Sequence, residues 1–114
     1  MKTMDLRINP KRLKQRIDTL GAIGRQGDAG IFRMAFSPSE IAARRWLMSE
    51  IAAAGLTCRV DAAANIIATL ANGQDNAPAV MIGSHIDTVP GGGRLDGALG
   101  VLVGLECLQR FKET

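Results

Sequence analysis

The chain holds a single histidine, His85, and two aspartates follow it at short and fixed distances. Asp87 lies two residues downstream and Asp96 lies eleven residues downstream, within the stretch MIGSHIDTVPGGGRLDG at residues 81–97. Imidazole and carboxylate together suit zinc, manganese, cobalt or nickel better than calcium. Three interpretations compete for this stretch: a metal site, a phosphate-binding loop, or a turn followed by a helix cap.

The spacing of the three side chains favours the metal interpretation. His85 and Asp87 are separated by one residue, so in an extended segment both side chains leave the same face. The Asp87 carboxylate can then accept the imidazole N–H, fix the tautomer and raise the basicity of the other ring nitrogen. The glycines at 91–93 let the loop fold back and return Asp96 to the same region.

One residue argues against a phosphate-binding loop, whereas the interpretation as a turn followed by a helix cap stays open. Gly91 and Gly93 begin a G-x-G-x-x pattern, but Asp96 stands where a dinucleotide fingerprint needs glycine, and its carboxylate would repel an anion. A lone histidine at a strand end is often only a surface residue, and an aspartate before a helix is often its cap. On the residues alone, the metal and structural interpretations both remain.

The elements that position this stretch begin with an amino-terminal helix. Asn9 and Pro10 form a helix-start signal, and the helix is predicted to run to about Leu20 and to stop at Gly21. The expected buried face consists of Leu13, Ile17 and Leu20. The next segment, residues 21–36, is rich in glycine and predicts a loop in which only residues 31–36 are ordered.

A second helix follows with the clearest boundaries in the chain. Ser37 and Glu40 form a capping box, Pro38 occupies the first helical position, and Gly55 supplies the stop. Its expected buried stripe consists of Ile41, Leu47, Met48 and Ile51.

Three short runs predict strands ahead of a last helix. They are LTCRV at 56–60, NIIATLA at 65–71 and AVMIGS at 79–84, and the third is apolar enough for a strand covered on both faces. DAAAN at 61–65 and NGQDNAP at 72–78 predict the turns between them. From residue 97 the pattern is helical again, with Asp96 at the cap position and Leu99, Leu102, Val103 and Leu108 as the apolar positions. The order predicts an α/β fold with helices packed on a partly parallel sheet, in one domain spanning residues 1–114.

Composition and charge narrow the function classes. The 114 residues are 46% hydrophobic, with no run long enough to cross a membrane and no apolar core of a signal peptide at the start. Cys58 and Cys107 form no metal-like pair, which fits a reducing compartment, so a cytoplasmic location is expected. Residues 1–33 hold eight Lys/Arg against three acids. This basic segment raises nucleic-acid binding as an alternative, although no aromatic residue is interleaved with it to stack on bases.

The stretch GSHIDTVPGGGRLDGALGVLVGLECL resembles the first metal-binding motif of the M20 metallopeptidase-like superfamily. More narrowly, it is similar to the branch of N-carbamoyl-L-amino-acid and allantoate amidohydrolases, for which the step from His85 to Asp96 is itself a mark. The upstream stretch RMAFSPSEIAARRWLMSEIAAAGLTCRVDAAANIIATL resembles the same branch, including the pair Asp61 and Asn65. Ala64 stands where glycine is usual in that branch. The resemblance covers about residues 9–110.

This resemblance implies the amino-terminal portion of a dinuclear-metal catalytic domain. His85 would ligate the first of two divalent ions (Zn, Mn, Co or Ni), Asp96 would bridge both, and Asp87 would orient His85 as its catalytic partner. It further implies hydrolysis of a carbamoyl or ureido C–N bond in a small-molecule substrate, and a homodimer formed through a domain outside this chain. Neither a membrane nor a nucleic acid is expected as a partner.

The family's general base and remaining ligands, including a Glu-Glu pair and a later histidine, are expected downstream of this chain. The chain would then carry half a site, with weak or no metal binding and no activity by itself. The alternative is a non-catalytic remnant, or a partner-binding module, of the same fold.

Overall fold

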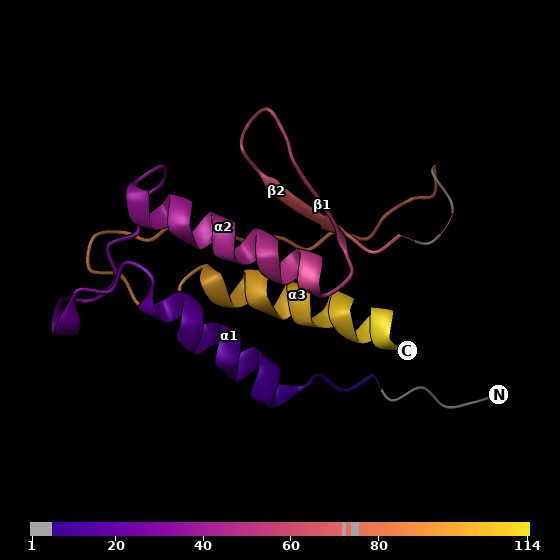
Figure 1. Ribbon diagram of the computed structural model, residues 1–114, viewed down its shortest axis with the longest axis horizontal. Coiled ribbons are helices and arrows are strands. Elements are labelled where there is room, and N and C mark those ends of the chain that lie inside the picture. The colour runs from indigo at the N-terminus through magenta and orange to yellow at the C-terminus, as the bar shows by residue number, and fades with distance from the viewer. Residues whose placement is uncertain (1–5, 72, 74–75) are drawn as a thin grey trace.

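The computed structural model describes residues 6–71, 73 and 76–114. In chain order the elements are α1 (Pro10–Ala22), the 3-10 turn η1 (Gly27–Ala29), α2 (Pro38–Ala53), β1 (Thr57–Val60), β2 (Ile66–Thr69) and α3 (Ala98–Glu113). Figure 1 shows the three helices, with α3 between α1 and α2 in this view, and the two strands beside α2. Helix α1 packs against α3, and α2 packs against both strands. None of the described helices is long and apolar enough to cross a membrane.

The first two predicted helix starts are confirmed by their capping hydrogen bonds. The Asn9 side chain accepts the Arg12 N–H at 3.1 Å, and the Ser37 hydroxyl accepts the Glu40 N–H at 3.3 Å. The Glu40 carboxylate reaches back to the N–H of Phe36 at 3.0 Å, one residue beyond the usual capping box. Helix α1 ends two residues after Leu20, and Gly55 follows α2 at φ +77°.

The predicted hairpin is present, and its pairing is antiparallel. Strands β1 and β2 pair in the register Thr57↔Thr69 to Val60↔Ile66, and residues 61–65 form the turn between them. Helices packed against a sheet were expected, and both occur. The expectation of a partly parallel sheet is wrong for the described residues, whose one sheet has two antiparallel strands.

The predicted third strand, residues 79–84, is not a strand in the structure. Val80 is 100% exposed, Met81 79% and Ile82 59%, whereas the sequence pattern predicted burial on both faces. The run is apolar as predicted, but no described strand lies beside it to form a ladder, so the segment has no assigned secondary structure. Of the predicted turn at 72–78, residues 72, 74 and 75 lie outside the described residues.

The core lies between the helices and against the hairpin. Its buried members are Leu20, Ala43, Leu47, Ile51, Ala54, Leu56, Ile86, Ala98, Leu102 and Leu105. Three predicted core positions are instead at or above one-third exposure: Met48 at 36%, Leu99 at 36% and Val103 at 37%. Leu105 is buried in place of Leu99 and Val103, because α3 turns its glycines toward the chain segment that carries His85.

Buried ion pairs fasten α1 to α3, which the amphipathic pattern did not predict. The fully buried Glu106 carboxylate accepts the Arg12 Nε–H and Nη2–H and the Asn9 N–H, each at 2.8 Å. Arg16 does not belong to the expected buried face of this helix, yet it is only 5% exposed, and its Nη1 lies 3.6 Å from Glu106. Although burial raises the pKa of Glu106, the hydrogen bonds from Arg12 and Asn9 hold it below its usual value.

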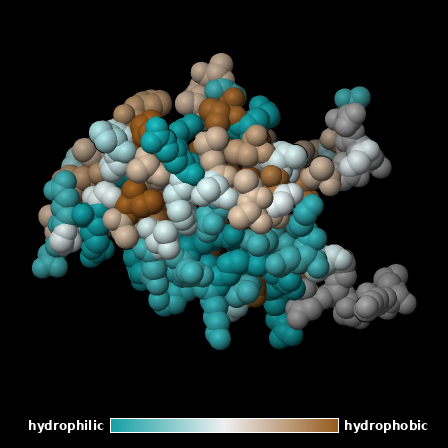
Figure 2. Space-filling model, in the orientation of Figure 1, coloured by the Kyte–Doolittle hydropathy of each residue, from teal (hydrophilic) through white to brown (hydrophobic). Residues whose placement is uncertain are grey.

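On the face of the molecule that Figure 2 shows, polar side chains gather near α1. Figure 2 shows hydrophilic side chains along the lower edge, where α1 lies in Figure 1, and more apolar ones toward the hairpin. Several bases of α1 are paired within the protein: Arg12 with Glu106 and Glu113, and Lys14 with Asp18. Some of the basic residues among the first 33 therefore form ion pairs within the protein.

Candidate metal centre

His85 lies on a glycine face of helix α3. Gly97, Gly100 and Gly104 are spaced so that they share one side of the helix, and each meets a different residue of the segment 82–85. A Cβ added at Gly104 would lie 2.9 Å from Ile82 Cδ1, and one added at Gly100 would lie 2.8 Å from Ser84 Cβ. A Cβ at Gly97 would lie 2.5 Å from both imidazole nitrogens of His85. The missing side chains thus admit the segment and seat the imidazole at the start of α3.

Asp87 faces the Nδ1 atom of His85 through two oxygens. The backbone carbonyl of Asp87 lies 3.0 Å from Nδ1, and its carboxylate oxygen Oδ1 lies 3.1 Å from the same atom. Because both oxygens can only accept, Nδ1 must carry the hydrogen, which leaves the lone pair of a neutral ring on Nε2. No described residue bonds to Nε2, and the side chains of His85 and Asp87 are 53% and 44% exposed. This orientation suits a metal-binding histidine.

Asp96 lies in the turn before α3, and it does not cap the helix. The N-cap is Gly97, at φ +73°, and it has no side-chain cap bond. The backbone carbonyl of Asp96 accepts the Ala98 N–H at 2.8 Å, while no described residue bonds to its exposed carboxylate. The capping interpretation is therefore wrong. The carboxylate stands one residue from Gly97, against which the His85 ring lies.

The glycine loop between Asp87 and Asp96 is fastened at two points. Ile31 and Gly92 exchange two backbone hydrogen bonds of 2.9 Å. Two residues later, the Arg94 guanidinium pairs with the Asp18 carboxylate of α1 at 2.9 Å. The glycines do let the loop fold back, as expected from the sequence, and these contacts hold it against residues 24–33 and α1.

Arg33 also holds this region, and sequence reasoning did not identify it. Its side chain is fully buried, and its Nε donates to the Ile86 carbonyl, between His85 and Asp87, at 2.7 Å. Burial lowers the pKa of Arg33, while the nearby charges of Asp87 and Glu40 raise it. No local pattern marks a buried arginine inside a glycine-rich segment, whereas the glycine spacing of α3 was visible in GALGVLVG.

The donor set fits a metal ion only in part. The His85 Nε2 atom and the Asp96 carboxylate offer two ligands of the chemistry that zinc or manganese accepts. Within the described ranges, no group of three or more His, Cys, Asp or Glu side chains could hold an ion. These residues therefore fit as two members of a larger ligand set, and they do not close a structural metal site.

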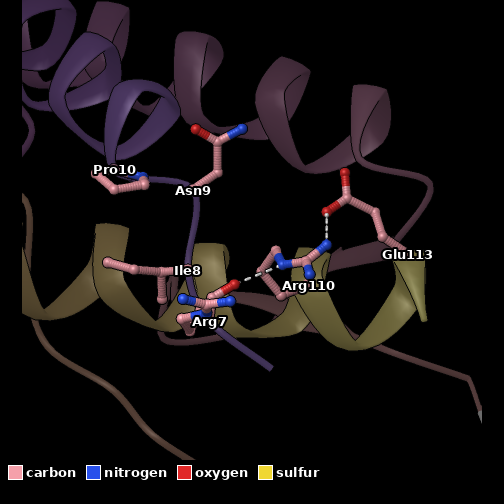
Figure 3. A pocket seen from close by; sticks show the side chains of 6 residues that line it. All are labelled: Arg7, Ile8, Asn9, Pro10, Arg110 and Glu113. Atoms are coloured by element: carbon pink, nitrogen blue, oxygen red, sulfur yellow. Dashed lines mark hydrogen bonds and ion pairs between the residues drawn. The ribbon is translucent and has the colours of Figure 1, made fainter. Parts of the chain in front are cut away.

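A broad surface hollow lies at the other end of α3. Its volume is about 640 Å³, and Figure 3 shows the six residues that line it: Arg7, Ile8, Asn9, Pro10, Arg110 and Glu113. Arg110 donates to the Arg7 carbonyl at 2.7 Å and pairs with Glu113 at 3.0 Å. The first of these contacts joins α3 to the segment before α1, and the second lies within α3. The hollow is separated from His85 by the length of that helix, so it is not the candidate centre.

In comparisons with known proteins, the model of Peptidase family M28 matches residues 65–114. The chain is 40% identical over 106 residues to an N-carbamoyl-L-amino acid amidohydrolase of Geobacillus stearothermophilus, covering 93% of this chain and 26% of the relative. It is 35% identical over 98 residues to an allantoate amidohydrolase of Bacillus subtilis (strain 168), covering 86% of this chain and 24% of the relative.

The fold is also similar to solved structures of the hydantoinase/carbamoylase family. An amidase of the hydantoinase/carbamoylase family from Burkholderia phymatum superposes with a TM-score of 0.84 at 40% identity, covering 98% of this chain and 27% of that one. A family member from Burkholderia ambifaria gives 0.90 at 35% identity. The chain thus spans about a quarter of the length of the proteins it matches.

Proposed function

Because the chain belongs to the hydantoinase/carbamoylase family of amidohydrolases, we propose that it carries the first metal-binding portion of a dinuclear, metal-dependent hydrolase. The expected substrates are small molecules with a carbamoyl or ureido C–N bond, such as N-carbamoyl-L-amino acids or allantoate. Two of the relatives carry these substrates in their names. The resemblance seen in the motif is confirmed for this branch, while the matching model is that of M28 rather than M20 peptidases.

One observation carries the proposal: the two oxygens of Asp87 on Nδ1 of His85. A carboxylate on one imidazole nitrogen turns the other toward a metal ion and strengthens it as a ligand. In the proposal His85 holds the first ion through Nε2, Asp96 bridges the pair, and Asp87 keeps the ring in place. When bound, two divalent ions act as Lewis acids and acidify a water molecule at neutral pH.

In this proposal, neither carboxylate of the candidate centre is available as a general base. Asp87 faces the imidazole, and Asp96 is assigned to the ions, so neither carboxylate is free to take a proton from water. The base and the other ligands are expected from the part of the relatives that this chain does not span. A homodimer formed through that part belongs to the same proposal.

The test uses His85 as a reporter, since it is the only histidine. Zinc is titrated into the ¹⁵N-labelled chain while the ring nitrogens are followed by NMR. We expect weak, exchangeable binding that shifts Nε2, that is reduced in Asp96→Ala and that vanishes in His85→Ala. Tight binding that survives His85→Ala would assign the ligands elsewhere.

The alternative is a non-catalytic module of the same fold. It is favoured by the lack of a three-ligand group among the described residues and by the exposed apolar segment at 80–82. The two candidates differ in the longer gene product. A protein that contains this chain together with a downstream Glu-Glu pair and a second metal-binding histidine should hydrolyse one of the named substrates, whereas a remnant should hydrolyse none.

A further inference from the structure

Arg33 is a buried cation, and no carboxylate of the described residues contacts it directly. Its residue exposure is 0%, and its guanidinium donates only to backbone carbonyls: Ile86 at 2.7 Å, and Leu20 and Ile23 at 2.8 Å each. Its Nη2 atom is buried and has no hydrogen-bond partner among the described residues. Burying such a group is costly, so a compensating role is expected.

The contacts of Arg33 converge on the residues that flank Asp87. The guanidinium holds the carbonyl of Ile86, which precedes Asp87. The backbone N–H of Arg33 donates to the Thr88 hydroxyl at 3.0 Å, and the Thr88 N–H donates to the Arg33 carbonyl at 2.8 Å. Arg33 therefore fixes the chain on both sides of the aspartate.

The same guanidinium ties these residues to α1. The Leu20 and Ile23 carbonyls lie in the last turn of α1 and at its C-cap. The Thr88 hydroxyl also donates to the Ile31 carbonyl at 3.1 Å, and Ile31 pairs with the glycine loop that leads to Asp96. One buried side chain thus joins α1, the 31–33 segment and the segment that carries His85 and Asp87.

We propose that Arg33 is a positioning residue for the His85–Asp87 pair, holding Asp87 so that its carbonyl and its carboxylate both face Nδ1 and leave Nε2 toward the metal. The inference rests on the proposed function only for the identity of the ligand. The orientation of the imidazole is a property of the metal-free protein and can be measured there.

The test compares Arg33→Met with Arg16→Met in the full chain. Arg16 is the matched control, because it is also a buried arginine with one nitrogen that forms no hydrogen bond to the described residues. It contacts Glu50, Glu106 and Gln109 rather than the His85 segment. Thermal unfolding measures the general loss of stability in each variant. Two-bond ¹H–¹⁵N spectra without metal then report which nitrogen of His85 carries the proton.

We expect the wild type and Arg16→Met to show the proton on Nδ1. Arg33→Met should move the population toward the Nε2–H form that an unconstrained neutral histidine prefers. Zinc affinity, followed at the same ring signals, should fall about 10-fold in Arg33→Met, the range seen when a ligand loses its supporting contact, and should not fall in Arg16→Met. A folded Arg33→Met with the wild-type tautomer would overturn the proposal.

Two further variants cover a failure of Arg33→Met to fold. Arg33→Lys keeps the charge, but a point-like ammonium cannot reach the Ile86 carbonyl and the α1 carbonyls together, so the tautomer should still change. If that variant also fails to fold, Thr88→Val removes the hydroxyl that accepts the Arg33 N–H and should shift the same signals. If the variant that folds gives the same His85 spectra as the wild type, the positioning role of Arg33 is rejected. If zinc does not shift the His85 ring signals in the wild type, the proposed metal-binding function is rejected. The comparison of the metal-free spectra still tests the positioning role of Arg33.

Discussion

The imidazole of His85 lies directly against Gly97, the residue that follows Asp96 and is the N-cap of α3. This contact brings together two residues that the sequence separates by a glycine loop. It also explains why glycine occupies position 97, because any Cβ there would enter the space of the ring.

Gly97→Ala should therefore disturb both stability and the histidine. The backbone at φ +73° disfavours any side chain, and the new Cβ would lie 2.5 Å from Nδ1 and Nε2. The two effects together predict a loss of about 3 kcal/mol in the free energy of unfolding, with changed His85 ring signals. Denaturant unfolding and NMR of the ring measure them.

Gly27→Ala is the matched control for this change. Gly27 has φ +51°, but an added Cβ would meet nothing within 4 Å. The expected loss is only the backbone cost of about 1 kcal/mol, with the His85 spectrum unchanged. Equal effects of the two substitutions would show that the ring contact contributes nothing.

Ala64→Gly should stabilise the protein. Ala64 has φ +68°, a conformation that L-residues rarely adopt, in the turn between β1 and β2. Asp61 closes this turn by accepting the Ala63 N–H at 3.0 Å and the Asn65 N–H at 2.8 Å, so the strain is held rather than relieved. Relief of the strain predicts a gain of about 1 kcal/mol in unfolding free energy. Ala63→Gly, at a neighbouring position without positive φ, should give no gain.

The buried Glu106 predicts how stability depends on pH. Its pKa is held below the ordinary value of 4.5, so its ion pairs stabilise the fold above that pH and are lost as pH falls through the folded pKa. Glu106→Gln should cost about 3 kcal/mol at pH 7, because Arg12 would lose a buried partner. The difference from the wild type should shrink at low pH, as measured by urea unfolding at pH 7 and pH 3.

Glu113→Gln tests whether an exposed carboxylate that pairs with Arg12 contributes as much to stability as the buried Glu106. Arg12 and Arg110 lower the pKa of Glu113 to about 2, yet its side chain is 38% exposed, so water screens the pairs. This variant should change the stability at pH 7 little. If it cost as much as Glu106→Gln, surface ion pairs rather than the buried carboxylate would hold α1 to α3.

The features that the sequence predicted well are set by neighbouring residues. Asn9, Ser37 and Gly55 mark helix ends through bonds or dihedrals within a few residues, and the β1–β2 hairpin closes over a short turn. The approach of Asp87 to His85 was likewise predictable, because alternation in an extended segment places both side chains on one face.

The features that it missed depend on distant partners. Residues 79–84 have the composition of a buried strand, but burial requires neighbouring strands, and the described residues supply none. Arg33 and Glu106 are charged residues whose burial is possible only because partners far along the chain satisfy them. No local pattern reveals such pairing, and hydrophobic periodicity assigns both side chains to the surface.

The chain alone should not hydrolyse N-carbamoyl amino acids or allantoate, even with added zinc, manganese, cobalt or nickel. The attacking water needs a base to take its proton, and Asp87 is held at 3.1 Å from the imidazole, behind the ligand rather than beside the water. Asp96 is assigned to the ions, and Arg94 is paired with Asp18 and accepts no proton at neutral pH. Ammonia release and free amino acid release should both stay at background. Turnover that requires metal and disappears in Asp96→Ala would contradict this prediction, and it would mean that copies of the chain assemble a complete site from repeated halves.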